Sequence, residues 1–114
     1  MAFARFEDII AWQKSRQFVV ACYDIFEKSQ DFSFRSQILR AVVSIMNNIA
    51  EGFERKGDKQ FSHFLYTSKG SCAEVKSMLY LALDLGYVSK KEFGVLFAQA
   101  TELSKIITGL LKSI

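Results

Sequence analysis

The sequence contains no proline and only six scattered glycines among its 114 residues. Sandwiches, barrels and other turn-rich β folds rely on these two residue types at their turns. The shortage therefore argues against the β classes and favours helices joined by short loops.

Cysteine and histidine are also scarce. Cys22 and Cys72 lie 50 residues apart and form no C-x-x-C motif, and His63 is the only histidine. A ferritin-like di-metal bundle needs two Glu-x-x-His pairs, and a structural zinc site needs four closely placed Cys or His ligands. We therefore expect no metal or other cofactor. We expect two buried, reduced thiols, with a single disulfide as the open alternative.

Few residues would support an enzyme. The glycines in Glu51-Gly52-Phe53 and Lys69-Gly70-Ser71 stand singly, so no phosphate-binding loop is present. Small helical ribonucleases of the HEPN class pair an arginine with a histidine a few residues later, whereas seven residues separate Arg55 from His63. We expect no catalytic residue and no small-molecule substrate. A partly exposed surface position is the interpretation of His63, and a small helical RNase is the least favoured alternative.

Length and composition predict one domain spanning residues 1–114. Half of the residues, 50%, are apolar, and the mean hydropathy is +0.11. This is high for an isolated small bundle, because small folds leave much of their surface exposed. We therefore expect a compact core and an apolar face that meets another subunit. A formal charge of +3 permits an anionic partner without requiring one.

The sequence shows no membrane segment. No apolar run approaches the roughly 20 residues of a spanning helix, and the first residues carry acids early and have no apolar signal-peptide core. We expect a cytoplasmic protein without a membrane partner.

Four segments show helical periodicity, and their ends carry capping residues. The first covers about residues 7–28 and the second about 33–55. Asp58 is the predicted N-cap of the third, which ends before Gly86. The fourth opens with the capping box Ser89-Lys90-Lys91-Glu92 and runs to the C-terminus. Short loops between such helices predict an all-α, antiparallel up-down-up-down four-helix bundle.

The apolar residues of each segment recur at steps of three, four or seven and so share a face. The predicted core stripes are, in chain order, Ile9, Trp12, Val19, Tyr23 and Phe26; Ile38, Val42, Ile45, Ile49 and Phe53; Phe61, Leu65, Ser68, Cys72, Val75, Leu79 and Ala82; and Phe93, Leu96, Ala100, Leu103, Ile107 and Leu110.

A polar stripe accompanies the apolar one on the second helix. Two interpretations stay open: a solvated flank, or a hydrogen-bonded seam shared with the third helix, where Ser71 and Glu74 lie one turn apart and would accept from Arg40. Gly70 beside Ser71 would allow the helices a close approach. We call the set the polar seam; it doubles as a candidate oligomer interface and comprises Arg40, Ser44, Asn48, Glu51, Ser71 and Glu74.

Basic residues gather at the loop between the second and third helices. We call Arg55, Lys56, Lys59 and His63 the hairpin cluster. The two interpretations are a solvated helix end and a phosphate contact with nucleic acid, which a ring of subunits would repeat. Aromatic residues are not expected to interleave with these bases, so base stacking is not predicted here.

Three stretches resemble a known family. Residues 6–14, FEDIIAWQK, are similar to its F-x-D-L-x-V-W-Q-K signature. Residues 37–52, QILRAVVSIMNNIAEG, are similar to its Q-x-x-R-A-x-x-S-I-x-x-N-I-A-E-G core, and residues 61–74 to its F-x-x-F-L-x-x-A-x-G-S-x-x-E segment. The family is the four-helix-bundle family also called the 23S ribosomal RNA intervening-sequence protein family. The accessory variability determinant of diversity-generating retroelements is similar in fold.

The resemblance implies a bacterial bundle that assembles as a homopentamer, has no enzymatic activity, and partners RNA or an RNA-bound protein. The chain departs from the pattern in three places. Met46 and the stretch 31–34 stand where proline is usual, and Ser68 stands where alanine is common. We therefore expect a non-catalytic oligomeric bundle that binds or scaffolds RNA, with a purely protein-binding oligomer as the alternative.

Overall fold

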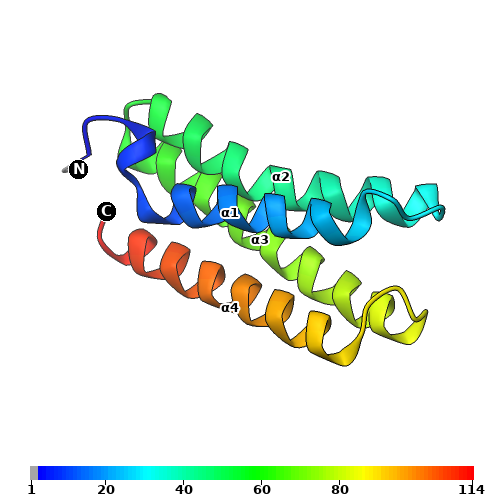
Figure 1. Ribbon diagram of the computed structural model, residues 1–114. Coiled ribbons are helices and arrows are strands. Elements are labelled where there is room, and N and C mark those ends of the chain that lie inside the picture. The colour runs from blue at the N-terminus through cyan, green and yellow to red at the C-terminus, as the bar shows by residue number, and fades with distance from the viewer. Residues whose placement is uncertain (1–2) are drawn as a thin grey trace.

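The computed structural model describes residues 3–114, which are all-α. A 3-10 turn, η1 (Phe6–Asp8), precedes four helices: α1 (Ile10–Phe26), α2 (Phe32–Glu54), α3 (Asp58–Asp84) and α4 (Lys90–Lys112), and residues 3–114 contain no strand. The prediction of four helices is confirmed. Figure 1 places the α1–α2 and α3–α4 loops at one end of the bundle, and the α2–α3 loop at the other end, with the C-terminus. No helix in the described range is long and apolar enough to cross a bilayer.

The α3 N-terminus differs from prediction by one residue. Gly57, not Asp58, is the N-cap: its backbone is extended (φ −153°, ψ 139°) and its carbonyl accepts from the Phe61 amide at 2.8 Å. Asp58 is the first helical residue, where its negative charge favours the positive end of the helix dipole.

The caps around the α3–α4 loop are as predicted. Gly86 takes the left-handed conformation (φ 76°), and the Tyr87 amide donates to the Ala82 carbonyl at 2.8 Å, which closes α3 in a Schellman motif. In the α4 capping box, Ser89 Oγ accepts from the Glu92 amide at 3.0 Å, and Glu92 Oε1 accepts from the Ser89 amide at 2.8 Å.

One side chain connects the two loops at this end. Asp31 Oδ1 accepts from the Phe34 amide at 3.1 Å and so caps α2, while Asp31 Oδ2 accepts from the Tyr87 hydroxyl at 2.6 Å. The Tyr87 hydrogen bond and the Phe34 amide hold the pKa of the Asp31 carboxyl below its usual range. We call this contact the loop clamp.

A single core runs the length of the bundle and follows the predicted stripes on three helices. All seven α3 positions are buried, Ser68 included, as are four of the five on α2 and four of the six on α4. Phe53, Phe93 and Leu110, at stripe ends, are half-buried. The core side chains therefore fix which faces of α2 and α3 remain for the polar residues.

The core stripe predicted for α1 is wrong at three of its five residues, which are not fully buried. Tyr23 is 38% exposed, and Trp12 and Val19 are half-buried. The positions facing the core are Ala11, Ser15, Phe18, Cys22 and Phe26. Ser15 fits there because its hydroxyl donates to the Ala11 carbonyl at 2.6 Å, which satisfies the polar atom within the helix.

The close approach between α2 and α3 occurs at Gly52. A Cβ at Gly52 would lie 2.5 Å from the Cβ of Phe64 and 3.2 Å from Cδ1 of Phe61. Gly70, the predicted contact glycine, has nothing within 4 Å of the same position and is exposed. Of these two glycines, only Gly52 marks a close approach between α2 and α3.

Both cysteines are free and buried, as the sequence predicted. Burial raises the pKa of the Cys22 thiol to about 12 and that of Cys72 to about 11. Each thiol acts as a small apolar core residue.

Candidate nucleic-acid interface and polar seam

The α2–α3 hairpin owes its shape to one strained residue. α2 ends at Glu54, Arg55 follows as its C-cap, and Lys56 turns the chain with a φ of 64°. Left-handed backbone is unfavourable for a residue with a Cβ, so glycine is usual at this position. Here the glycine comes one residue later, at Gly57, and the turn is built from a lysine.

The structure brings the hairpin cluster together at one end of the bundle, and all four members are exposed. Arg55 pairs with Glu51 at 3.6 Å, an exposed contact one helical turn apart that contributes little. Lys56 and Lys59 form no ion pair within residues 3–114. Their charges are therefore available to a partner.

Aromatic rings lie under two of these bases, contrary to the sequence expectation. The Arg55 guanidinium is 4.9 Å from the ring centroid of Phe64, and the Lys56 ammonium is 5.5 Å from that of Phe53. Both rings are half-buried, so they orient the cations and do not offer open faces for stacking.

The local charge of the hairpin is balanced. Residues 51–59 contain three bases, Arg55, Lys56 and Lys59, and three acids, Glu51, Glu54 and Asp58, so their formal charge is zero. Any attraction of a phosphate must therefore come from the placement of individual side chains and not from a broad positive field.

Arg55, the C-cap of α2, and His63 of α3 both contact the ring of Phe64. The His63 ring packs edge-on against Phe64, with centroids 5.6 Å apart. No hydrogen bond joins the Arg55 and His63 side chains in the described part of the chain. The exposed position predicted for His63 is confirmed.

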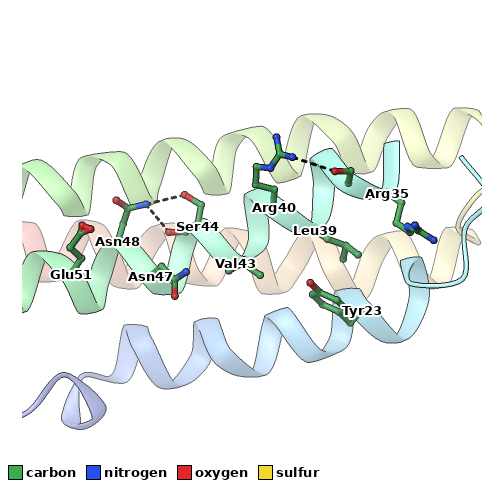
Figure 2. Close-up of a pocket in the computed structure, with 10 residues that line it drawn as sticks. Tyr23, Arg35, Leu39, Arg40, Val43, Ser44, Asn47, Asn48 and Glu51 are labelled. Carbon is green, nitrogen blue, oxygen red and sulfur yellow. Dashed lines mark hydrogen bonds between the residues drawn. The ribbon is translucent and has the colours of Figure 1, made fainter. Parts of the chain in front are cut away.

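The polar seam divides into two parts. Ser44, Asn48 and Ser71 form a hydrogen-bonded set between α2 and α3: the Ser44 and Ser71 hydroxyls are 2.9 Å apart, and Asn48 Nδ2 donates to the Ser44 carbonyl and hydroxyl at 2.8 and 2.9 Å. Figure 2 shows the two Asn48 bonds. All three residues are half-buried, so here the seam interpretation holds.

The other part is a solvated flank. Arg40 is exposed and its side chain donates to Ser36 Oγ at 3.4 Å within residues 3–114, so the predicted donation from Arg40 to Ser71 and Glu74 is wrong. Arg40 lines an open pocket together with Ser71 and Glu74 of α3, but its guanidinium donates to Ser36 and to neither of these two residues. Glu51 pairs with Arg55, and Glu74 is exposed without an ion pair in residues 3–114.

An open groove follows the outer face of α2 beside α1. Its volume is about 660 Å³, and it presents amide and guanidinium donors that the sequence did not single out, notably Asn47 and Arg35. Figure 2 shows Tyr23 of α1 approaching α2 at the groove, near Leu39. The lining of the groove combines charged, amide and hydroxyl side chains, and within residues 3–114 it contains no histidine or cysteine.

One hydrogen bond between α2 and α3 was not predicted from the sequence. Ser68 is fully buried and its hydroxyl donates to the Ile45 carbonyl at 2.7 Å. The position of Ser68 on the apolar stripe of α3 could have indicated this bond, because a serine hydroxyl in the core must find an acceptor.

Comparison with known proteins gives a family but no activity. No curated protein matches the chain. A crystal structure described as a protein with unknown function from the S23 ribosomal protein family of Bacteroides thetaiotaomicron superposes with a TM-score of 0.85 at 22% identity, covering 90% of this chain and 99% of that one. This similarity shows the shared fold. The profile of the 23S rRNA-intervening sequence proteins matches residues 7–109. The chain therefore belongs to the 23S rRNA-intervening sequence protein family.

Proposed function

We propose that this single-domain, antiparallel up-down-up-down bundle is a non-catalytic oligomeric scaffold that contacts RNA through the hairpin cluster. The supporting observation is that Lys56 and Lys59 are exposed at one end of the bundle and lack an ion pair within residues 3–114. Each phosphate contact adds a sequence-independent, salt-sensitive increment of affinity.

The proposal includes assembly into a homo-oligomer, with five subunits as the state that the family resemblance implies. Several large apolar side chains are at least 46% exposed, which is costly in an isolated bundle. They are Ile10, Val20, Leu81, Leu85, Val95 and Phe32. Light scattering should give a multimer mass, and a monomer at high micromolar concentration would contradict assembly.

RNA binding is tested with a structured RNA at low and moderate salt. The triple variant Arg55→Ala, Lys56→Ala, Lys59→Ala should bind more weakly, and its log–log salt slope should fall by about 0.9 for each lost contact. The matched control removes three bases at the opposite end of the bundle, Lys28→Ala, Lys90→Ala and Lys91→Ala. Equal affinity of both triple variants and wild type would overturn the RNA contact.

The non-catalytic part has its own test. RNA incubated with the protein should stay intact, and wild-type cleavage abolished by His63→Ala would instead establish a ribonuclease.

A purely protein-binding oligomer is the second candidate, and the zero formal charge of residues 51–59 favours it. It predicts a stable multimer with no RNA affinity even at low salt. The same binding and mass measurements therefore separate the two candidates.

A further inference from the structure

A second surface, on α3, places two lysines between two tyrosines. Tyr66, Lys69, Lys76 and Tyr80 are separated by steps of three, seven and four residues. In an α-helix these steps keep the four side chains within about 80° of one another. We call these residues the aromatic–basic stripe.

The stripe borders α4. The Tyr80 ring lies 5.2 Å from Phe93 and 5.3 Å from Phe97, and the Lys76 ammonium lies 4.9 Å from the Phe97 centroid. These contacts fix the end of the stripe against α4, whereas the tyrosines themselves stay accessible: Tyr66 is 63% exposed and Tyr80 is 55% exposed.

The electrostatics of this surface differ from those of the hairpin. Lys69 and Lys76 form no ion pair in the described part of the chain, and no acid lies between Tyr66 and Tyr80 at a stripe position. The α4 positions that continue from Phe97 at helical spacing are Thr101, Ser104 and Thr108, all neutral. Asp84, one turn beyond Tyr80, is the acid nearest in register.

We propose that the aromatic–basic stripe binds single-stranded nucleic acid, with bases stacked on Tyr66 and Tyr80 and phosphates held by Lys69 and Lys76. This deepens the RNA role proposed above and rests on it, but it uses a different face. Tyr80 lies 14 residues after Tyr66, which is about 21 Å along the helix. Unpaired bases stack on exposed aromatic rings while lysines follow the backbone, which is the recognition mode of single-strand sites.

Two other occupants fit less well. Paired bases in a duplex present no free faces to the tyrosines. A second copy docked by this same surface about a two-fold axis would set lysines against lysines, with no acid on the stripe to compensate.

The test is fluorescence anisotropy with a labelled oligo-uridine of about 12 nucleotides, within the site sizes of single-strand binders. Tyr66→Ala and Tyr80→Ala should each weaken binding between about fivefold and 150-fold without changing the salt slope. Tyr66→Phe and Tyr80→Phe keep the ring and should bind like wild type. Lys69→Ala with Lys76→Ala should lower the slope by about 1.4, which is 0.7 for each single-strand contact.

Tyr23→Ala, at an exposed tyrosine of α1, is the matched control and should leave binding unchanged. Unchanged affinity of the two stripe tyrosine variants, with unchanged thermal midpoints, would overturn the stripe. A shift in their solution mass with no loss of affinity would also overturn it, in favour of a contact between copies. If structured RNA still depends on Arg55, Lys56 and Lys59 in that case, the hairpin proposal stands alone; if wild type binds neither RNA, both proposals fail.

Discussion

At the scale of single residues, Gly52 sets the distance between α2 and α3. It is buried, and Cβ of Phe64 occupies the space that a side chain at Gly52 would need. The neighbouring ring of Phe61 closes the other side at 3.2 Å. Phe64 Cβ is bonded directly to the α3 backbone, so it cannot move away as the far end of a flexible side chain would.

Gly52→Ala should therefore lower the free energy of unfolding by about 2 kcal/mol, the range of overpacked cores. Gly70→Ala, in the exposed interior of α3, should raise it by up to about 1 kcal/mol, because alanine favours the helix. Urea denaturation of both variants measures the contrast. A stabilised Gly52→Ala protein would show that the helices are free to separate there.

The divided polar seam gives a second contrast. Asn48→Ala removes two hydrogen bonds to Ser44. It should lower the free energy of unfolding by about 1 kcal/mol relative to Asn47→Ala, which changes helix propensity equally at an exposed neighbour.

Arg40→Ala should change the free energy of unfolding by less than about 0.5 kcal/mol, because Arg40 is exposed and has no ion pair within residues 3–114. Thermal and urea unfolding check both; a large loss in Arg40→Ala would return it to the buried-pair interpretation.

Sequence spacing could predict the Ser44–Ser71 contact, since both residues flank the correctly predicted core stripes of α2 and α3. It could not show that Arg40 donates to Ser36 and not to Glu74, because that choice depends on the conformation of a long, exposed side chain. Nor could it place Gly52 against Phe64, because which glycine approaches a neighbour depends on the phase of both helices. The chemical type of a residue and its face of the helix can thus be predicted from the sequence. Which residue of a neighbouring helix it contacts depends on how the helices pack.

At the scale of elements, the hairpin carries strain in its basic residue. Lys56 holds a φ of 64°, a conformation that costs a lysine more than it costs glycine.

The core-facing residues of α3 were well predicted because its buried positions are nearly all apolar and regularly spaced. The core-facing residues of α1 were poorly predicted because the small residues Ala11 and Ser15 face the core while the large residue Tyr23 is exposed. Residue size and hydrophobicity therefore indicated the wrong face of this helix.

Lys56→Gly should raise the free energy of unfolding by about 0.5–1 kcal/mol, the strain relief less the entropy of a glycine in the unfolded chain. Lys59→Gly, in the first turn of α3, should lower it by about 1 kcal/mol. Both remove one positive charge, so comparing their RNA affinities separates charge from stability. A destabilised Lys56→Gly protein would mean that the lysine contributes through its contact with Phe53.

The loop clamp makes stability depend on pH. The pKa of Asp31 is lower in the folded chain than its usual value of 3.8, so the ionised carboxylate stabilises the fold at neutral pH. That contribution is lost as pH falls through the folded pKa. Tyr87→Phe should lower the thermal midpoint by a constant amount between about pH 6 and 8, and the gap should narrow below pH 3.8. A gap independent of pH would exclude Asp31 as its source.

At the scale of the whole molecule, the buried thiols report on opening of the bundle. Cys22 of α1 and Cys72 of α3 have raised pKa values and no exposed surface. A thiol reacts as its thiolate and only when accessible. Reaction with a thiol reagent at pH 8 should therefore be slow and should follow the rate of unfolding for both cysteines. Fast reaction of one thiol alone would reveal local opening of its helix.

The placement of the first described residue has a practical meaning for any assay of these proposals, because Phe3 lines a pocket with Lys56 and Gly57, and the C-terminus lies at the same end of the bundle (Figure 1). A purification tag, dye or surface linkage at this end of the bundle would obstruct the basic residues of the hairpin cluster. It would weaken RNA binding in the assay just as a substitution of those residues would. Anchoring the molecule from the opposite pole, where Asp31 joins Tyr87, leaves the hairpin unobstructed.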